Sequence, residues 1–380
     1  MVIRKKCKIK NLVLFLTFGG SLEIWEKNGI LDREVRIYEE LYKKFGIFTH
    51  IISYGNNKDL VIGRKFSFLK VYTNSFRIHP RLYNFLIPVL FFKVFLKVEI
   101  IKTNQFFGVH IAKRVSNFFK KPLIIRQGFN FLEHIKEEFG INSKQYKDAA
   151  LYESKYVDKG DANIYTSERI ANQYKKKYKI NTKKVFIVPN YVCLDDWQPS
   201  YKIKKKTNTI IFFGRLCNQK NIINLIHAVK KLNKKIILIG DGEQKNEIKR
   251  LLAKLSVDHI LLDRMEQRKI IPFLRKSDVF IIPSLYEGNP KTLIEMMIFK
   301  IPVIASYVKG NKEILNEDMA VISKTTESSI QTSIKKFYAL PNLKKKKMIE
   351  NSFLYAKKEF EINKIVQKER QVYSAITTNE

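Results

Sequence analysis

The alternation of short apolar segments with amphipathic helical segments constrains the fold of this chain more than any other feature. In the first half, residues typical of buried strands occupy 11–17, 50–54, 98–105, 122–129, 161–167 and 184–190. In the second half, strands are expected at 209–213, 235–239, 259–262, 279–283, 302–305 and 320–322. Helical periodicity lies between many of them, as over 31–45, 109–119, 221–232, 243–255, 267–276 and 291–299. Strands that alternate with helices are typical of parallel sheets covered by helices on both faces. The sequence therefore predicts an α/β protein with two doubly wound parallel sheets.

The segment 195–207 separates the two series. It lacks apolar periodicity and contains Pro199 and a run of lysines, which is typical of an interdomain linker. A chain of 380 residues is also long enough for two domains. We therefore predict a first domain over 1–200 and a second over 201–355. A helix over about 356–380 is expected to cross back and pack on the first domain, with a free C-terminal helix as the alternative.

The chain is strongly basic, with 71 Lys and Arg against 36 Asp and Glu and a net charge of +35. One interpretation is a partner that carries phosphates, such as anionic lipid, nucleic acid or a nucleotide. The other is compositional, because Lys, Ile and Asn are abundant throughout the chain. The wide spread of the lysines favours the second, with attraction to an anionic membrane surface as a consequence. No helix-turn-helix, zinc-finger or aromatic RNA-binding pattern is present, so no nucleic-acid partner is expected.

Two apolar stretches bear on localisation. Residues 11–17 are too short for a signal peptide, lack a cleavage site and lead into Gly19 and Gly20, which favours a first strand. Residues 82–96 are the most apolar stretch, but they are too short to span a bilayer and include Pro88 and Lys93. A buried or interfacial helix is expected there. The scattered Cys7, Cys193 and Cys217 have no metal-binding spacing and indicate a reducing compartment without a disulfide framework.

The segment that follows the strand at 279–283 carries two carboxylates. Glu287 is expected on the loop after the strand, and Glu295 on the helix that begins near Pro290. In parallel sheets, ligands bind outside the carboxyl ends of the strands. Gly288 permits close backbone approach, the helix N-terminus favours phosphate, and Glu295 is placed to accept hydrogen bonds from a diol. The pattern indicates a site for a nucleotide linked to a sugar. Two solvated glutamates beside a turn are an equally weighted alternative from spacing alone.

Other strand ends also carry polar residues. Gly214 and Arg215 follow the strand at 209–213 and Lys220 opens the next helix, so both cations are placed to reach a diphosphate. Gly240-Asp241-Gly242 resembles part of a dinucleotide motif, but an isolated Gly-x-Gly is weak. The alternative for each cation is an ordinary solvated side chain.

In the first half, Gly19 and Gly20 follow the first strand, and a tight turn is the simpler interpretation of that pair. Asn104 lies at the polar end of the strand at 98–105. Arg126 and Gln127 end the strand that begins near residue 122. These residues lie where an acceptor or donor sugar is expected, with an edge loop as an alternative of similar weight.

Taken together, these motifs resemble those of the group 1 (family 4) retaining glycosyltransferases. The resemblance rests on Gly214-Arg215-Leu216 with Lys220-Asn221, on Gly240-Asp241-Gly242 and on Glu287-x7-Glu295. The segments 166–168 and 187–192 also match the family pattern. It covers nearly the whole chain. It implies the GT-B fold, in which two Rossmann-like domains face a central cleft.

The resemblance also implies roles for residues of this chain. Arg215 and Lys220 are expected to hold the donor diphosphate and stabilise the leaving group, and Glu287 to face the donor sugar. Glu295 is expected to bind the ribose. The remaining donor-binding positions implied by the resemblance are Gly19, Gly20, Gly214, Gly288, Asn289 and Gly310. No metal and no cofactor are expected.

The chain departs from the family pattern at two positions. Many members read Glu-Gly-Phe-Gly where this chain has Asn289 and Pro290, which bears on donor choice. Some members carry a histidine at the strand end where this chain has Arg126 or Gln127, so no histidine is assigned a catalytic role.

The resemblance implies transfer of a sugar, with retention, from a nucleotide-diphosphate sugar to a hydroxyl of a glycan or lipid-linked acceptor. Surface polysaccharide or lipopolysaccharide synthesis is the expected setting. A cytoplasmic location is expected, with association with the inner face of the cytoplasmic membrane as a further hypothesis. A nucleotide-sugar epimerase of the same two-domain plan is one alternative. A non-catalytic basic protein that binds membrane or nucleic acid is the other.

Overall fold

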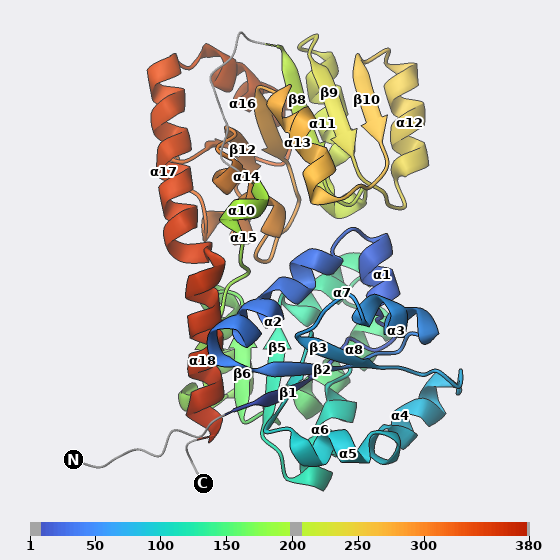
Figure 1. Ribbon diagram of the computed structural model, residues 1–380. Helices are drawn as coiled ribbons and strands as arrows, with labels where there is room; N and C mark the ends of the chain where they lie inside the picture. Colours follow the sequence, from blue (N-terminus) through green and yellow to red (C-terminus); the bar gives the residue numbers. More distant parts are fainter. Residues whose placement is uncertain (1–8, 198–206, 378–380) are drawn as a thin grey trace, which may run out of the picture. The chain divides into compact units, whose positions relative to one another are not determined.

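The computed structural model describes residues 9–197 and 207–377 (Figure 1). The chain divides into two compact units: unit 1 comprises Met1–Pro189 and Asn363–Glu380, and unit 2 comprises Asn190–Ile362. The predicted linker at 195–207 begins within a short helix, α10 (Leu194–Trp197), which belongs to unit 2. Most of the remaining linker, 198–206, lies outside the described residues.

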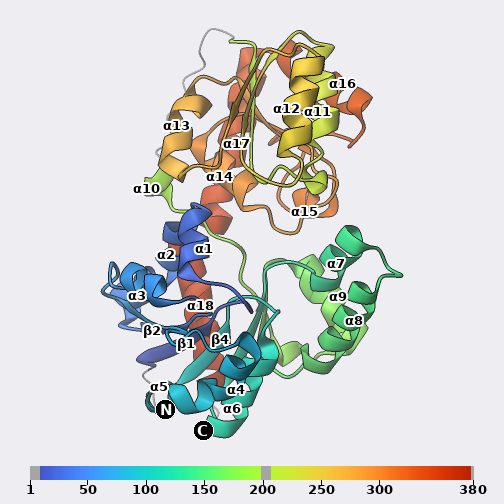
Figure 2. The ribbon, with the colours of Figure 1, turned by 90° about the vertical axis from the view of Figure 1, so that its right-hand side faces the viewer.

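Unit 1 is built on a parallel sheet whose seven described strands have the order β3-β2-β1-β4-β5-β6-β7. The strands are β1 (Asn11–Phe15), β2 (Phe48–Ile52), β3 (Leu69–Tyr72), β4 (Ile100–Thr103), β5 (Leu123–Gln127), β6 (Ala162–Tyr165) and β7 (Val185–Ile187). The helices are α1 (Leu22–Lys27), α2 (Leu31–Phe45), α3 (Asn57–Gly63), α4 (Pro80–Leu90), α5 (Phe92–Lys97), α6 (Val109–Phe119), α7 (Phe131–Phe139), α8 (Lys144–Tyr156), α9 (Glu168–Tyr178), the 3-10 helix η1 (Thr182–Lys184) and α18 (Ile362–Thr377). Figure 2 shows helices on both faces of this sheet.

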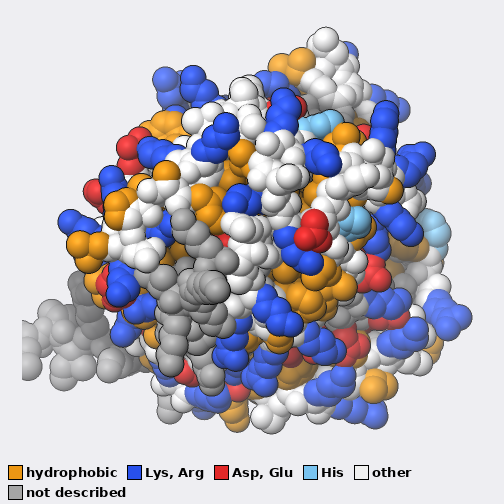
Figure 3. Space-filling view, turned by 90° about the horizontal axis from the view of Figure 1, so that it is seen from above, with side chains coloured by type: hydrophobic (Ala, Val, Ile, Leu, Met, Phe, Trp, Pro, Cys, Tyr) orange, Lys and Arg blue, Asp and Glu red, His pale blue; other side chains and the backbone are white. Residues whose placement is uncertain are grey.

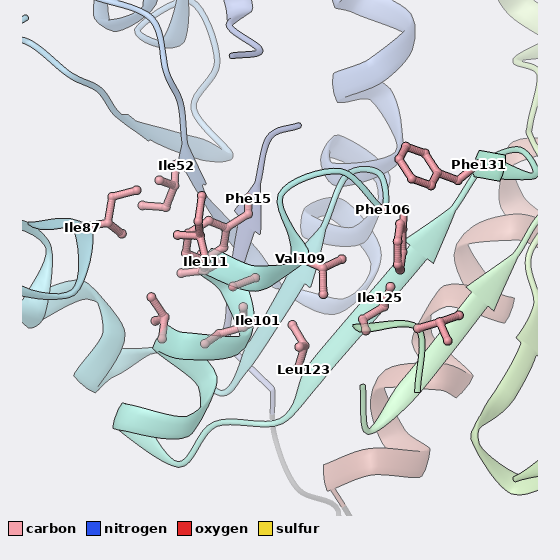
Figure 4. Close-up of a cluster of buried hydrophobic side chains, with 14 of the residues drawn as sticks. Phe15, Ile52, Ile87, Ile101, Phe106, Val109, Ile111, Leu123, Ile125 and Phe131 are labelled. Carbon is pink, nitrogen blue, oxygen red and sulfur yellow. The ribbon is translucent and has the colours of Figure 1, made fainter. Parts of the chain in front are cut away.

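The core of unit 1 follows from strands that are apolar on both faces, as expected for a parallel sheet covered on both sides. β1 and β4 are buried over almost their whole length. On one face, Phe15 and Ile101 pack with Ile87 of α4 and Ile111 of α6 in one buried cluster (Figure 4). On the other face, Lys102 of β4 meets Glu369 of α18. Because helices cover both faces, the carboxyl ends of the strands are the expected place for a ligand.

Several elements of unit 1 differ from the expectation. β3 and the helices α1, α3, α7 and α8 were not predicted. The apolar stretch 82–96, expected as one helix, forms α4 and α5, which meet at Phe91. Phe91 leaves the helical conformation (φ −117°, ψ 27°) three residues after Pro88, whose missing N–H and ring weaken a helix.

The C-terminal helix was predicted wrongly as one continuous segment. It is two helices, α17 (Asn342–Phe360) in unit 2 and α18, which continues into unit 1. Glu361 between them is extended and forms a parallel bridge with Val192. The Val192 N–H donates to the Phe360 carbonyl and the Ile362 N–H to the Val192 carbonyl. These bonds replace helical ones and separate the two helices.

Unit 2 contains a second parallel sheet, with six described strands in the order β10-β9-β8-β11-β12-β13. The strands are β8 (Thr209–Phe213), β9 (Lys235–Ile239), β10 (His259–Leu262), β11 (Val279–Ile282), β12 (Val303–Ser306) and β13 (Val321–Ser323). The remaining helices are η2 (Asn218–Lys220), α11 (Ile222–Lys230), α12 (Lys245–Lys254), α13 (Gln267–Arg275), α14 (Lys291–Phe299), α15 (Lys309–Lys312) and α16 (Glu327–Ala339). Two buried apolar clusters line the sheet. The prediction of two parallel, helix-covered sheets is confirmed.

His50 of β2 makes the stability of unit 1 depend on pH. Burial, with Lys70 and Lys97 nearby, lowers the pKa of His50 from 6.5 to about 4. The unfolded chain therefore takes up a proton at a higher pH than the folded chain does. Because the ring is only partly buried, we expect the free energy of unfolding to fall by about 1–2 kcal/mol from pH 7 to pH 4 through this residue. Denaturant unfolding of the His50→Gln variant should lack this component, and identical pH profiles would contradict it.

Candidate functional site

The strand order of unit 2 places two of the predicted motifs side by side. With β8 counted as its first strand, the sheet has the order 3-2-1-4-5-6, which reverses between β8 and β11. In open parallel sheets, ligands bind outside the carboxyl ends of the strands at such a reversal. Arg215 and Lys220 follow β8, and Glu287 follows β11. Residues distant in the sequence therefore meet at the position that the topology favours for a ligand.

Lys220 and Glu287 are in direct contact. The Lys220 Nζ lies 2.5 Å from the Glu287 Oε1, and the Glu287 side chain is only 6% exposed. The Ser284 hydroxyl, which is fully buried, donates to the same carboxylate oxygen at 2.6 Å. A carboxylate that accepts a buried hydroxyl and an ammonium has a fixed orientation. The sequence analysis did not identify Ser284, although it directly follows the strand predicted at 279–283.

A chain of buried hydrogen bonds links Ser284 to the next strand, β12, and to α15. The Ser306 hydroxyl at the end of β12 donates to the Ser284 carbonyl at 2.6 Å, and the Asn311 side chain donates to the Ser306 carbonyl at 2.9 Å. Gly310 lies so close to the loop that a Cβ there would be 2.2 Å from the Gly288 carbonyl and 2.4 Å from that of Glu287. The predicted glycine at 310 is therefore required by the close approach of α15 to the Glu287 loop.

The loop after β8 packs tightly against the loop after β9. A Cβ at Gly240 would lie 1.9 Å from the Gly214 carbonyl, and the Leu216 N–H donates to the Asp241 carbonyl at 2.9 Å. These contacts require the glycine at 240 and hold the backbone on either side of Arg215. Arg215 itself is exposed, and within the described residues it has neither a hydrogen-bond nor an ion-pair partner. Its guanidinium is thus available to an anionic ligand.

The other predicted residues of unit 2 lie at the same end of the sheet, near the carboxyl ends of the strands. Glu295, on α14, is 2% exposed and accepts a hydrogen bond from Gln267 Nε2 at 3.0 Å. Asn289 bonds with Asn190: its side-chain oxygen accepts from the Asn190 N–H and its carbonyl from the Asn190 side chain. Gln267, at the start of α13, is a further polar residue that the sequence analysis missed. Its position shortly after the end of β10 could have marked it in the sequence as a candidate site residue.

The predicted residues of unit 1 lie at the carboxyl ends of three neighbouring strands. Gly19 and Gly20 follow β1, Asn104 follows β4, and Arg126 and Gln127 end β5. Gly19 has a φ of +77°, and the Gly20 N–H donates to the Thr17 carbonyl at 2.7 Å, which forms a tight turn. Arg126 donates to the Asn104 carbonyl at 3.3 Å. The Gln127 side chain is 1% exposed, and neither of its polar atoms has a hydrogen-bond partner among the described residues.

Other chemistry near the unit 2 site is limited. Burial raises the pKa of the Cys217 thiol, which therefore stays protonated at neutral pH. Within the described residues, no group of three or more His, Cys, Asp or Glu side chains is arranged to hold a metal ion. The groups the site offers are two cations, two buried carboxylates and loop backbone.

This arrangement lies in a segment with known relatives. Residues 195–354 match the family model described as "Glycosyl transferases group 1". This segment belongs to the group 1 glycosyltransferase family. It includes every predicted site residue of unit 2, from Gly214 to Gly310, so the resemblance to the group 1 glycosyltransferases is confirmed over residues 195–354.

Individual relatives agree with the family model. An uncharacterized glycosyltransferase of Methanocaldococcus jannaschii is 32% identical over 60% of this chain and 56% of its own length. An Escherichia coli UDP-Gal:alpha-D-GlcNAc-diphosphoundecaprenol alpha-1,3-galactosyltransferase is 29% identical over 36% of this chain and 40% of its own length. The matched regions thus span about half the length of these relatives or less.

The likeness in structure extends over both units. The Anabaena protein HepE, solved in complex with UDP and glucose, superposes with a TM-score of 0.72 at 15% sequence identity and covers 95% of this chain and 98% of the HepE chain. Two Rossmann-like domains in one chain, as in GT-B glycosyltransferases, are therefore confirmed as the fold. The family match lies within unit 2, and unit 1 is the other Rossmann-like domain.

Proposed function

We propose that this protein is a retaining glycosyltransferase that moves a sugar from a nucleotide-diphosphate sugar to a hydroxyl. The observation that carries the proposal is the Lys220–Glu287 contact at the strand-order reversal, beside the exposed Arg215. A cation pair suits a diphosphate, and an oriented carboxylate suits the hydroxyl groups of a sugar. Membership of residues 195–354 in the glycosyltransferase family supports it.

The proposed reaction uses the residues at the carboxyl ends of β8 and β11, without a metal ion. Arg215 and Lys220 hold the diphosphate and balance the negative charge that grows as the bond from the anomeric carbon to the phosphate oxygen breaks. The acceptor hydroxyl forms its new bond on the same face, and its proton passes to the departing diphosphate. Glu287 orients the sugar, with the backbone of Gly288 and Asn289 beside it. Because attack and departure occur on one face, the anomeric configuration is retained.

Unit 1 is the proposed acceptor side. Gly19 and Gly20 are proposed to let the backbone approach the donor phosphate, and Asn104, Arg126 and Gln127 to bind the acceptor. The E. coli relative is named for transfer to a diphosphoundecaprenol-linked sugar, which supports a lipid-linked glycan as acceptor in surface polysaccharide or lipopolysaccharide synthesis.

Within the described residues, no helix combines the length and apolar character needed to cross a membrane. We propose a cytoplasmic enzyme that works at the inner face of the membrane.

A panel of nucleotide-diphosphate sugars tests the proposal. Thermal shift identifies the donor that stabilises the protein, and release of nucleoside diphosphate is then measured with and without a lipid-linked acceptor. The proposal predicts release that depends on the acceptor and a product with the anomeric configuration of the donor. Inversion of the configuration would contradict retention. Conversion of the donor to its epimer without diphosphate release would indicate an epimerase instead.

Glu295 is proposed to accept hydrogen bonds from the ribose hydroxyls. We expect the Glu295→Gln variant to bind the nucleoside diphosphate about 10- to 100-fold more weakly, because hydrogen bonds to a charged acceptor are worth about 1.5–3 kcal/mol. Isothermal titration calorimetry measures this effect. Glu247→Gln on α12, away from β11 and α14, is the control and should leave affinity unchanged. Unaltered binding by Glu295→Gln would refute the ribose assignment.

Gly310 is expected to tolerate no side chain. In the Gly310→Ala variant the new Cβ would overlap the Glu287 and Gly288 carbonyls, so the loop that carries Glu287 must move. A displacement of about 1 Å at a reacting group costs about 100-fold in rate, and we expect a loss of kcat/KM of that size. Lys312→Ala on the same helix removes an exposed side chain and should have less than a twofold effect. Equal activity of both variants would show that the loop position is unimportant.

A further inference from the structure

The helices α4 and α5 carry apolar side chains on two faces. The inner face is buried in the core of unit 1, and the outer face is exposed. On α4, Tyr83 and Ile87 point into the core and are at most 1% exposed. Leu82, Phe85 and Val89, three and four residues apart and hence on one helix face, are 52%, 67% and 73% exposed. A surface helix normally places charged and polar residues there. The outer face of α4 therefore presents apolar side chains to solvent in addition to those that the helix buries.

The apolar face continues across α5 and α6. Phe92 and Leu96 of α5 and Phe118 of α6 are also exposed. The rings of Phe92 and Phe119 lie 5.4 Å apart, and those of Phe118 and Phe119 4.9 Å apart, which joins the two helices. Figures 1 and 2 both show α4, α5 and α6 side by side in unit 1. We call this surface the α4–α6 face; its exposed apolar residues are Leu82, Phe85, Val89, Leu90, Phe92, Leu96 and Phe118.

The charges on the same helices are all of one sign. Residues 80–97 and 109–121 contain no Asp or Glu. Their basic residues are Arg81, Lys93, Lys97, Lys113, Arg114, Lys120 and Lys121. On the face shown in Figure 3, by contrast, basic and acidic side chains mix. The Arg114 guanidinium lies 5.5 Å from the centre of the Phe85 ring, so cations and exposed aromatics are neighbours.

We propose that the α4–α6 face docks on an anionic lipid bilayer. Helices that lie in the membrane interface combine inserted Phe and Leu side chains with Lys and Arg that meet acidic headgroups. A nucleic acid would need the cations without a band of exposed aliphatic side chains, and a protein interface core is depleted of lysine. This inference rests on the membrane location proposed above, but it uses no residue of the proposed donor or acceptor sites, so the two proposals can fail separately.

Vesicle flotation with the full chain tests the proposal. Vesicles of phosphatidylcholine alone are compared with vesicles that also contain phosphatidylglycerol. The wild-type protein should float with the anionic vesicles and bind the neutral ones at least tenfold more weakly. The F85S/V89S variant, which loses apolar contact, and the K93Q/K97Q variant, which loses charge, should each bind anionic vesicles at least tenfold more weakly than wild type.

Matched controls lie on α17, which has exposed leucines and lysines as well as acidic residues. Leu343→Ser with Leu354→Ser, and Lys346→Gln with Lys347→Gln, make the same kinds of change at exposed positions and should alter binding less than twofold. Equal binding to both vesicle types, wild-type binding by the two α4–α5 variants, or equal loss in the controls would overturn the proposal. So would a dimer that the F85S/V89S variant abolishes. Nucleoside diphosphate binding should be unchanged in every variant, so failure of the donor site is scored separately.

Discussion

Replacement of both Arg215 and Lys220 by glutamine is expected to reduce turnover by about 1000-fold or more, because the diphosphate then leaves without cationic stabilisation. Removal of a single well-placed donor to a developing anion already costs about 100- to 1000-fold in other enzymes. Glutamine is shorter than either side chain but keeps a polar hydrogen-bond donor. The variant therefore removes both positive charges without placing an apolar group at the site. The measurement is the acceptor-dependent release of nucleoside diphosphate.

The fold should survive this change. Arg215 is exposed, and Glu287 keeps its hydrogen bond from Ser284 when the Lys220 ammonium is removed. Arg250→Gln with Lys254→Gln is the matched control, since it removes one arginine and one lysine from exposed positions on α12. That variant should retain wild-type turnover. Near-normal turnover in the Arg215/Lys220 variant, with an unchanged circular dichroism spectrum, would contradict the assignment of both cations.

Replacement of Glu369 by leucine is expected to destabilise unit 1 by about 3–5 kcal/mol. Glu369 of α18 and Lys102 of β4 form an ion pair at 2.7 Å, and each side chain is 1% exposed. Burial lowers the pKa of Lys102, and the charge of Glu369 opposes this shift. Without Glu369, the lysine is left as a buried, unpaired cation or must give up its proton. Either outcome weakens the packing of α18 on the sheet.

Removal of both charges should restore most of the loss. A Lys102→Met, Glu369→Leu double variant fills the same space with apolar groups, a change that is often neutral in proteins. The exposed pair of Lys300 and Glu350, at 2.8 Å, is the control, and Glu350→Gln there should cost less than about 1 kcal/mol. Denaturant unfolding, followed by a probe in unit 1, measures all three variants. A Glu369→Leu protein as stable as wild type would show that α18 does not depend on this pair.

Much of the fold was predictable because strands buried on both faces have an unmistakable sequence pattern. Each of β1, β5 and β8 to β12 contains an uninterrupted run of at least three apolar residues, and each was expected within a few residues of its position. β3 was missed because it is four residues long and interrupted by the exposed Lys70. The continuous helix expected at the C-terminus is broken by hydrogen bonds to Val192, a contact between residues far apart in the sequence that no local pattern reveals.

The candidate site was predictable in its residues but not in its contacts. Strand ends and the family resemblance pointed to Arg215, Lys220, Glu287 and Glu295. That Lys220 binds Glu287 directly depends on the adjacency of β8 and β11, which only the sheet order establishes. Ser284 and Gln267 were missed because a single Ser or Gln at a strand end carries little signal without its partner.

Hydrogen–deuterium exchange with a bound nucleotide-diphosphate sugar tests the central claim most directly. If the activated sugar binds at the carboxyl ends of β8 and β11 in unit 2, exchange should slow in peptides that cover 214–221 and 284–295. Peptides of α12 and α16 should be unaffected. Protection confined to other regions of the chain, with 214–221 and 284–295 unchanged under saturating donor, would contradict the account.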